Sequence, residues 1–248
     1  MRELVYLSDS KLEQFLPELR SFWPRPKVNL KLPILEIGME PAGDAEKKRL
    51  KHLARVIAEI ERSARWFTEP DIATGQWVHF EAPLNYLTVN TSHQDVAFFV
   101  DRGTASKDYP TGGTVRLLLH CSGTHLIMGQ APVKVSRPVG ELVKVHSDIP
   151  ASFPSSGGWL TVDNVEHLLQ KLRYYPQPAD TRRAEPLERT PRLPVAISRL
   201  LLAIDGRVFP ETAAWMAGYA RISANLTDGD NRYVVASPLY VEYATPPR

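Results

Sequence analysis

The chain has 248 residues with 30 Lys and Arg against 28 Asp and Glu, so its net charge is +2. This length suits one large domain or two small ones, and it buries enough surface to need no disulfide or metal staple. A charge this close to neutral argues against a dedicated binder of nucleic acid or of an anionic membrane. The 21 prolines exceed the usual ~5%, and we expect them to mark connectors between elements.

Cysteine usage and the N-terminal sequence indicate the compartment. Cys121 is the single cysteine, so no intrachain disulfide can form, which is typical of a reducing cytoplasm. The first residues acquire charges early and lack the apolar core of a signal peptide. No stretch approaches the ~18 apolar residues of a membrane-spanning helix. We therefore expect a soluble, cytoplasmic protein without a membrane partner.

Short strands and helices alternate in the first quarter of the chain. Residues 3–8 are β-prone and predict a strand, and Asp9 stands at the start of a helix that must end before Pro24. Apolar residues that alternate over 28–37 predict a second strand, bent at its internal proline. Apolar residues at steps of three and four predict an amphipathic helix over 42–67.

The middle of the chain reads as strands. Residues 77–80 predict one strand, which could continue to Val89 past Pro83. Residues 96–100 and 115–119 predict two more, and a weaker strand or pair spans 132–146. The unbroken apolar runs AFFV and LLL indicate strands that are covered on both faces.

The next hundred residues read as helices separated by proline-rich connectors. A loop is predicted over 147–159, a helix over 161–174, and an extended, exposed connector with five prolines over 175–194. A short helix over 197–204 follows, with Pro194 near its first turn.

A stretch near the C-terminus is apolar nearly all round. We predict a buried helix over 210–226, opened by Pro210 and rich in small residues that let neighbouring backbones approach closely. A final strand over 233–243 is expected to add to the sheet.

These elements predict an α+β protein with a mixed, largely antiparallel sheet. Two helices of the N-terminal half cover the sheet, a C-terminal helical subdomain lies against it, and the final strand returns to it. We divide the chain into a sheet domain (1–150), a loop, helix and connector (151–194), and a helical segment with the final strand (195–248). Alternatively, all three form one domain.

The densest polar cluster, HCSGTH, follows the LLL strand, and such strand ends often carry ligand sites. Other strand ends could converge there if the strands run in the same direction. The candidate ligand-binding residues are therefore Ser8, Asp9, Asp101, His120, Ser122, Thr124 and His125. The competing interpretation is a polar turn whose histidines satisfy local backbone groups, with Asp9 acting as a helix N-cap.

Two chemical interpretations of the same cluster are weaker. A metal site on His120, Cys121 and His125 has suitable zinc ligands, but the spacing matches no standard zinc motif, so we expect no metal and no cofactor. A Cys121 nucleophile would take His125 as its base, because consecutive side chains on a strand point to opposite faces. No nucleotide-binding, serine-hydrolase or kinase motif is present.

Two segments resemble a family of uncharacterised bacterial proteins. YLSDSKL, from Tyr6 to Leu12, looks like that family's Y-[LV]-S-D-x-K-[LV] opening. LLLHCSGTHLIMG is similar to its apolar strand followed by G-S-x-x-H-[LV]-x-G, with Cys-Ser-Gly in place of the usual Gly-Ser order. AAWMAGYARISANL and VVASPLYVEYA also look like segments of close relatives. The resemblance implies that the first two segments form a paired feature. It implies an accessory role in bacteria, with conflict systems as one setting, and no established activity.

A candidate site without a complete catalytic set favours a non-enzymatic sensing or accessory module. It would bind a small molecule or a protein partner near the 120–125 turn, and we expect no nucleic-acid partner. One alternative is a hydrolase or transferase that uses Cys121 and His125. The other is a structural subunit of a bacterial conflict-system assembly, in which the 210–226 helix forms an interface, for example in a homo-oligomer.

Overall fold

The computed structural model describes residues 3–15, 42–90, 95–127, 133–135, 160–173, 192–208 and 212–246. The chain divides into two compact units, one of Ser8–Ser63 and one of Met1–Leu7 with Ala64–Arg248. The strand predicted over 28–37, the loop over 147–159 and nearly all of the proline-rich connector lie outside the described residues. In the described part, no helix is long and apolar enough to cross a membrane.

The smaller unit contains two helices, α1 (Asp9–Phe15) and α2 (Ala42–Ile60). The amphipathic pattern of α2 is confirmed, since Leu53, Ile57 and Ile60 are buried. The helix ends before the predicted residue 67, because Ser63 donates both its backbone N–H and its hydroxyl to the Ile60 carbonyl. That the two N-terminal helices cover the sheet stays a prediction.

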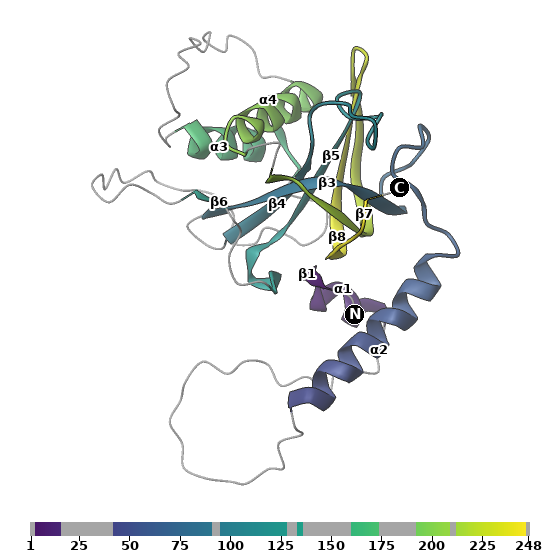
Figure 1. The fold of residues 1–248 in the computed structure, drawn as a ribbon. Coiled ribbons are helices and arrows are strands. Elements are labelled where there is room, and N and C mark those ends of the chain that lie inside the picture. The colour runs from purple at the N-terminus through teal and green to yellow at the C-terminus, as the bar shows by residue number, and fades with distance from the viewer. Residues whose placement is uncertain are drawn as a thin grey trace, which may run out of the picture. The chain divides into compact units, whose positions relative to one another are not determined.

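Five strands carry the larger unit: β3 (Trp77–Asn90), β4 (Asp95–Asp101), β5 (Val115–Ser122), β7 (Ala214–Asp228) and β8 (Asn231–Tyr243). They close into a ring in the order β3–β4–β5–β8–β7 and back to β3 (Figure 1). β5 and β8 are parallel, and the other four neighbouring pairs are antiparallel. This is the connectivity of the OB-fold, a five-stranded Greek-key barrel.

The long strand β3 joins the two sides of the ring. Its first half, Trp77–Leu84, pairs with β7, and its second half, Leu84–Asn90, pairs with β4. The strand therefore continues past Pro83, as the sequence predicts. The Pro83 carbonyl accepts a hydrogen bond from the Arg102 backbone N–H.

Three short strands extend the sheet. β1 (Leu4–Leu7) lies antiparallel to β8, while β2 (Arg65–Trp66) and β6 (Val133–Val135) lie parallel to β3. The predicted fold class is thus confirmed, with a mixed, mostly antiparallel sheet to which the final strand returns.

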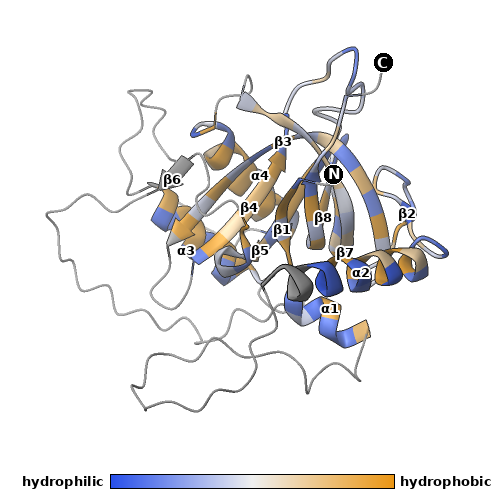
Figure 2. Cartoon of the chain, turned by 60° about the horizontal axis from the view of Figure 1, so that its bottom comes forward, coloured by the Kyte–Doolittle hydropathy of each residue, from blue (hydrophilic) through white to orange (hydrophobic). Residues whose placement is uncertain are grey.

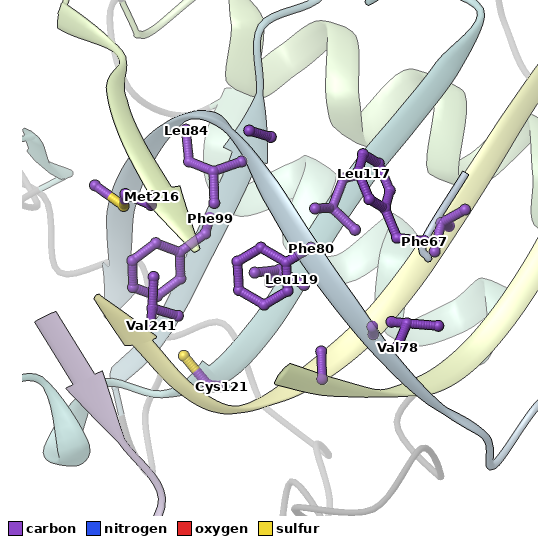
Figure 3. Close-up of a cluster of buried hydrophobic side chains, with 14 of the residues drawn as sticks. Phe67, Val78, Phe80, Leu84, Phe99, Leu117, Leu119, Cys121, Met216 and Val241 are labelled. Atoms are coloured by element: carbon purple, nitrogen blue, oxygen red, sulfur yellow. The ribbon is translucent and has the colours of Figure 1, made fainter. Parts of the chain in front are cut away.

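The interior of the ring is filled by large apolar side chains from all five strands (Figure 3). One cluster of side chains that are at most 1% exposed includes Phe80, Phe99, Leu117 and Val241. The buried aromatic side chain of Phe67 belongs to the same cluster. Because side chains on a strand alternate between inside and outside, each strand contributes every second residue to this cluster. The barrel is therefore a packed core.

Two helices, α3 (Val162–Arg173) and α4 (Leu193–Asp205), pack on an outer face of the barrel to which β3, β4, β5, β7 and β8 contribute. Phe98 and Leu118 from the strands contact a second buried cluster that includes Leu168 and Leu200 from the helices. In Figure 2 most of β4 is orange, in keeping with its burial on both faces. The predicted two-sided cover of the AFFV and LLL strands is thus confirmed.

The helix predicted over 210–226 is wrong, because this segment forms most of β7. Its backbone pairs with β3 on one side and with β8 on the other. Its small residues permit that close pairing, since a Cβ on Gly218 would lie 2.2 Å from the Tyr240 carbonyl oxygen. An apolar run alone does not separate a buried helix from a strand covered on both faces. The interface helix of the conflict-system alternative is lost with it, and the C-terminal helical subdomain consists of α3 and α4.

Candidate functional site

The polar cluster after β5 forms an ordered surface turn, named here the β5 turn (residues 122–127). A short 3-10 helix, Gly123–His125, begins after Ser122, whose Oγ accepts the Thr124 backbone N–H at 3.4 Å. The two hydroxyl oxygens of Ser122 and Thr124 lie 2.8 Å apart. A Cβ on Gly123 would lie 2.8 Å from the Cβ of Asp95, so glycine lets the turn lie against the start of β4.

The β5 turn is attached to β1. The His125 ring lies edge-on to the Tyr6 ring, with centroids 6.2 Å apart, and the Ile127 N–H donates to the Val5 carbonyl. Tyr6 belongs to the first of the two segments that carry the family resemblance, and His125 belongs to the second. The structure therefore brings the two segments into contact at these residues.

His120 and Cys121 are not part of the accessible turn. They point to opposite faces of β5, as predicted for consecutive residues of a strand. The His120 Nε2 lies 2.9 Å from the Ser223 Oγ, and the side chain is buried. The Cys121 Sγ lies in the barrel core and donates to the Ala97 carbonyl at 3.6 Å (Figure 3). Both positions favour structural roles.

We expect iodoacetamide to label Cys121 much more slowly in the folded chain than it labels free cysteine at pH 7. Cys121 is 7% exposed and belongs to the apolar cluster of the barrel core, and burial in apolar surroundings disfavours the reactive thiolate. Mass spectrometry of the folded and the urea-unfolded chain measures both rates. Labelling of the folded chain at or above the free-cysteine rate would contradict this and support the nucleophile alternative.

Asp101 lies away from the β5 turn. β4 and β5 are antiparallel, with Val96 opposite Ser122, so Asp101 is at the far end of β4. Its carboxylate is fully buried, receives the Arg116 Nε–H at 2.9 Å and accepts the Tyr109 hydroxyl at 2.9 Å. Burial raises the pKa of Asp101 to about 6, while the Arg116 charge acts in the opposite direction.

Ser8 and Asp9 belong to the smaller, helical unit. The Ser8 Oγ accepts the Lys11 backbone N–H at 3.4 Å, so Ser8 caps α1. The Asp9 carboxylate accepts the Arg49 Nε–H at 2.9 Å and ties α1 to α2. Their participation in a common site with His125 stays a prediction.

Sequence reasoning missed the partners of Asp101. Arg116 bridges Asp101 and Asp205, and Tyr109 completes the group. The available signal was the single arginine inside the apolar run VRLLL, because a charge on a strand covered on both faces needs a partner. Asp205, the second carboxylate partner of Arg116, lies 89 residues further along the chain, and nothing in the sequence near Arg116 points to it.

Comparison with known proteins gives one family. Within the described ranges, no group of three or more His, Cys, Asp and Glu side chains could hold a metal ion. Neither the curated proteins nor the solved structures contain a match to the chain. The family of unknown function DUF7019 matches residues 2–144, which confirms the resemblance to an uncharacterised family. Because this match spans more than half of the sequence, the chain belongs to the DUF7019 family of unknown function.

Proposed function

We propose that the chain is a non-enzymatic binding module that recognises a partner protein through the β5 turn. The observation that carries this proposal is the difference in accessibility among the polar residues around β5. Thr124 is exposed and His125 is partly exposed, whereas His120, Cys121 and Asp101 are buried in contacts within the fold.

The barrel architecture supports a site at the rim. OB-type barrels bind their ligands on the face of the second and third ring strands and on the flanking loops. In this chain those strands are β4 and β5, and α3 and α4 cover their outer face. The barrel interior is packed with side chains. The β5 turn lies at one end of the covered face, beside the start of β4, where a partner can reach it.

The composition of the turn supports a protein partner over a small molecule. Ile127 is 46% exposed and follows the exposed Thr124 and the partly exposed His125 by three and two residues in the chain. An exposed apolar residue among polar ones resembles the arrangement of protein interfaces, which have an apolar centre and a polar rim. A bound small molecule would instead be detected as added mass in native mass spectrometry of the purified chain.

The test places a photo-cross-linking amino acid at Thr124 in cells, with Thr227 as the control. Both residues are exposed, and Thr227 lies on the β7–β8 hairpin. A discrete adduct from position 124 and none from position 227 would support the proposal and identify the partner. Equal adducts from both positions, or none from either, would overturn it.

Once the partner is identified, Ile127→Asp is expected to weaken its binding by tenfold or more. Each tenfold corresponds to roughly 1.4 kcal/mol of binding free energy. The matched control is Leu202→Asp, which places the same charge on another exposed apolar residue, 67% exposed on α4. Both variants should keep the free energy of unfolding within about 0.5 kcal/mol of wild type, as surface substitutions do. Isothermal titration measures the affinities. Equal weakening by both variants would contradict the assignment to the turn.

A retained small molecule, detected by native mass spectrometry of the purified chain and lost in Ile127→Asp, would contradict a protein partner while keeping the turn as the site. The hydrolase or transferase and the conflict-system subunit stay predictions.

A further inference from the structure

Arg116, Asp101, Asp205 and Tyr109 form a group that we name the Arg116 clamp. The Arg116 Nε donates to Asp101, and its two Nη atoms donate to the two carboxylate oxygens of Asp205, each at 3.0 Å. Nη2 also donates to the Asp101 backbone carbonyl. A single guanidinium is thereby held between two carboxylates.

The clamp joins α4 to the barrel. Asp101 ends β4, Arg116 lies on β5, and Asp205 ends α4. A carboxylate at a helix C-terminus is unfavourable, because the helix dipole is negative there, and a cation beside it offsets this. Arg116 supplies that cation. The clamp is thus a polar attachment at one end of a helix that otherwise contacts the barrel through apolar side chains.

The charges of the clamp do not balance when all three groups are ionised. Two carboxylates and one guanidinium give a net charge of −1, while the Asp101 side chain is fully buried and that of Arg116 is 9% exposed. A buried net charge is unfavourable, and one proton would remove it. Asp205 is 31% exposed, so water stabilises its charge better than that of Asp101. The proton should therefore bind to Asp101.

Within the clamp, Asp101 is the group that titrates in mild acid. Burial raises its pKa to about 6, opposed by the charge and hydrogen bond of Arg116, the Tyr109 hydroxyl and the Leu117 backbone N–H. Tyr109 stays neutral, because burial and the nearby Asp101 charge raise its pKa. Arg116 stays charged, because the two carboxylates more than offset its burial and raise its pKa. His167 on α3, which packs against α4, has a pKa lowered by burial and by Lys171, so its protonation acts in the opposite direction.

We propose that the Arg116 clamp takes up a proton in mild acid and thereby holds α4 against the barrel more firmly at pH 5 than at pH 7. When the pKa of an acid is higher in the folded state than in the unfolded state, the folded state binds more protons between the two values. The stabilisation is then present at low pH and is lost as the pH rises through about 6. Most paired carboxylates have a lowered pKa, so the stabilisation that they give is lost as the pH falls. The clamp would therefore set how firmly α4 is held on the barrel.

Hydrogen exchange of the α4 amides tests the proposal. After correction for intrinsic exchange rates, the protection of α4 in the wild-type chain should be about tenfold higher at pH 5 than at pH 7. Asp101→Asn keeps an acceptor for Arg116 and removes the titrating charge, so its protection should no longer rise on acidification from pH 7 to pH 5. Protection that falls on acidification in the wild type, or an unchanged pH dependence in Asp101→Asn, would overturn the proposal.

A second variant keeps the test decisive if Asp101→Asn fails to fold. Asp205→Asn removes the competing carboxylate, so the clamp is neutral at pH 7 and the rise in protection should move to below pH 5. Asp228→Asn, on the exposed end of the β7–β8 hairpin, is the matched control and should behave as wild type. A wild-type profile in Asp205→Asn would also overturn the proposal.

Discussion

Arg116→Met is expected to lower the free energy of unfolding by about 3–5 kcal/mol at pH 7, because it leaves the buried Asp101 carboxylate without its cation. The same substitution removes the cation from the C-terminus of α4, where Asp205 then opposes the helix dipole. Urea unfolding followed by tryptophan fluorescence measures the loss. A loss under about 1 kcal/mol would mean that Asp101 finds another partner or takes up a proton once Arg116 is removed.

The loss should be smaller at pH 5, where Asp101 accepts a proton and no longer needs a cation. The double variant Arg116→Met with Asp101→Asn serves as the control, because it removes both the cation and the stranded charge. It should recover part of the stability at pH 7, since removing both partners of a buried pair costs less than removing one. A double variant less stable than Arg116→Met alone would contradict this explanation.

Gly218→Ala is expected to destabilise the chain by about 3 kcal/mol, the upper end of the usual cost of overpacking. The new Cβ would lie 2.2 Å from the Tyr240 carbonyl oxygen and 2.8 Å from the Phe80 ring, so β7 would have to move away from β8. If residues 210–226 formed a helix, the same substitution would stabilise it by about 1 kcal/mol, because alanine favours a helix more than glycine does. The sign of the change in urea midpoint therefore separates the two structures.

The matched control is Gly229→Asn at the tip of the β7–β8 hairpin. Gly229 has a φ of +58°, and a Cβ added there would have no neighbour within 4 Å. Asparagine tolerates this left-handed conformation better than most residues. The control should stay within about 0.5 kcal/mol of wild type. An equal loss from both substitutions would indicate a general sensitivity of the hairpin rather than the close approach at Gly218.

Local patterns were sufficient for most of the described elements. Apolar spacing predicted α2 and α3, and β-branched and aromatic runs predicted β3, β4, β5 and β8. These patterns suffice because the period of a helix or strand decides which of its side chains face the core. The same alternation separated His120 from Cys121. It could not say what each would contact, since Ser223 and Ala97 come from other strands.

Not all of the prolines lie in connectors between elements. Pro83 and Pro238 lie inside β3 and β8, both strands of the ring. Pro238 pairs with Ala220 next to a register shift in the β7–β8 ladder, where the regular hydrogen-bond pattern is interrupted. Prolines in this chain therefore also stand within strands, Pro83 in a regular ladder and Pro238 beside an irregularity, which the composition alone did not indicate.

The sequence by itself determined the periodic helices, the apolar strands and the polar turn after β5, because these depend on neighbours close in the chain. Only the tertiary structure decided that residues 214–228 are a strand, because this segment is stabilised by backbone pairing with β3 on one side and β8 on the other. Only the tertiary structure joined Asp101, Arg116 and Asp205, because a buried charge is satisfied by whichever partner the fold brings within reach, at any distance in the sequence.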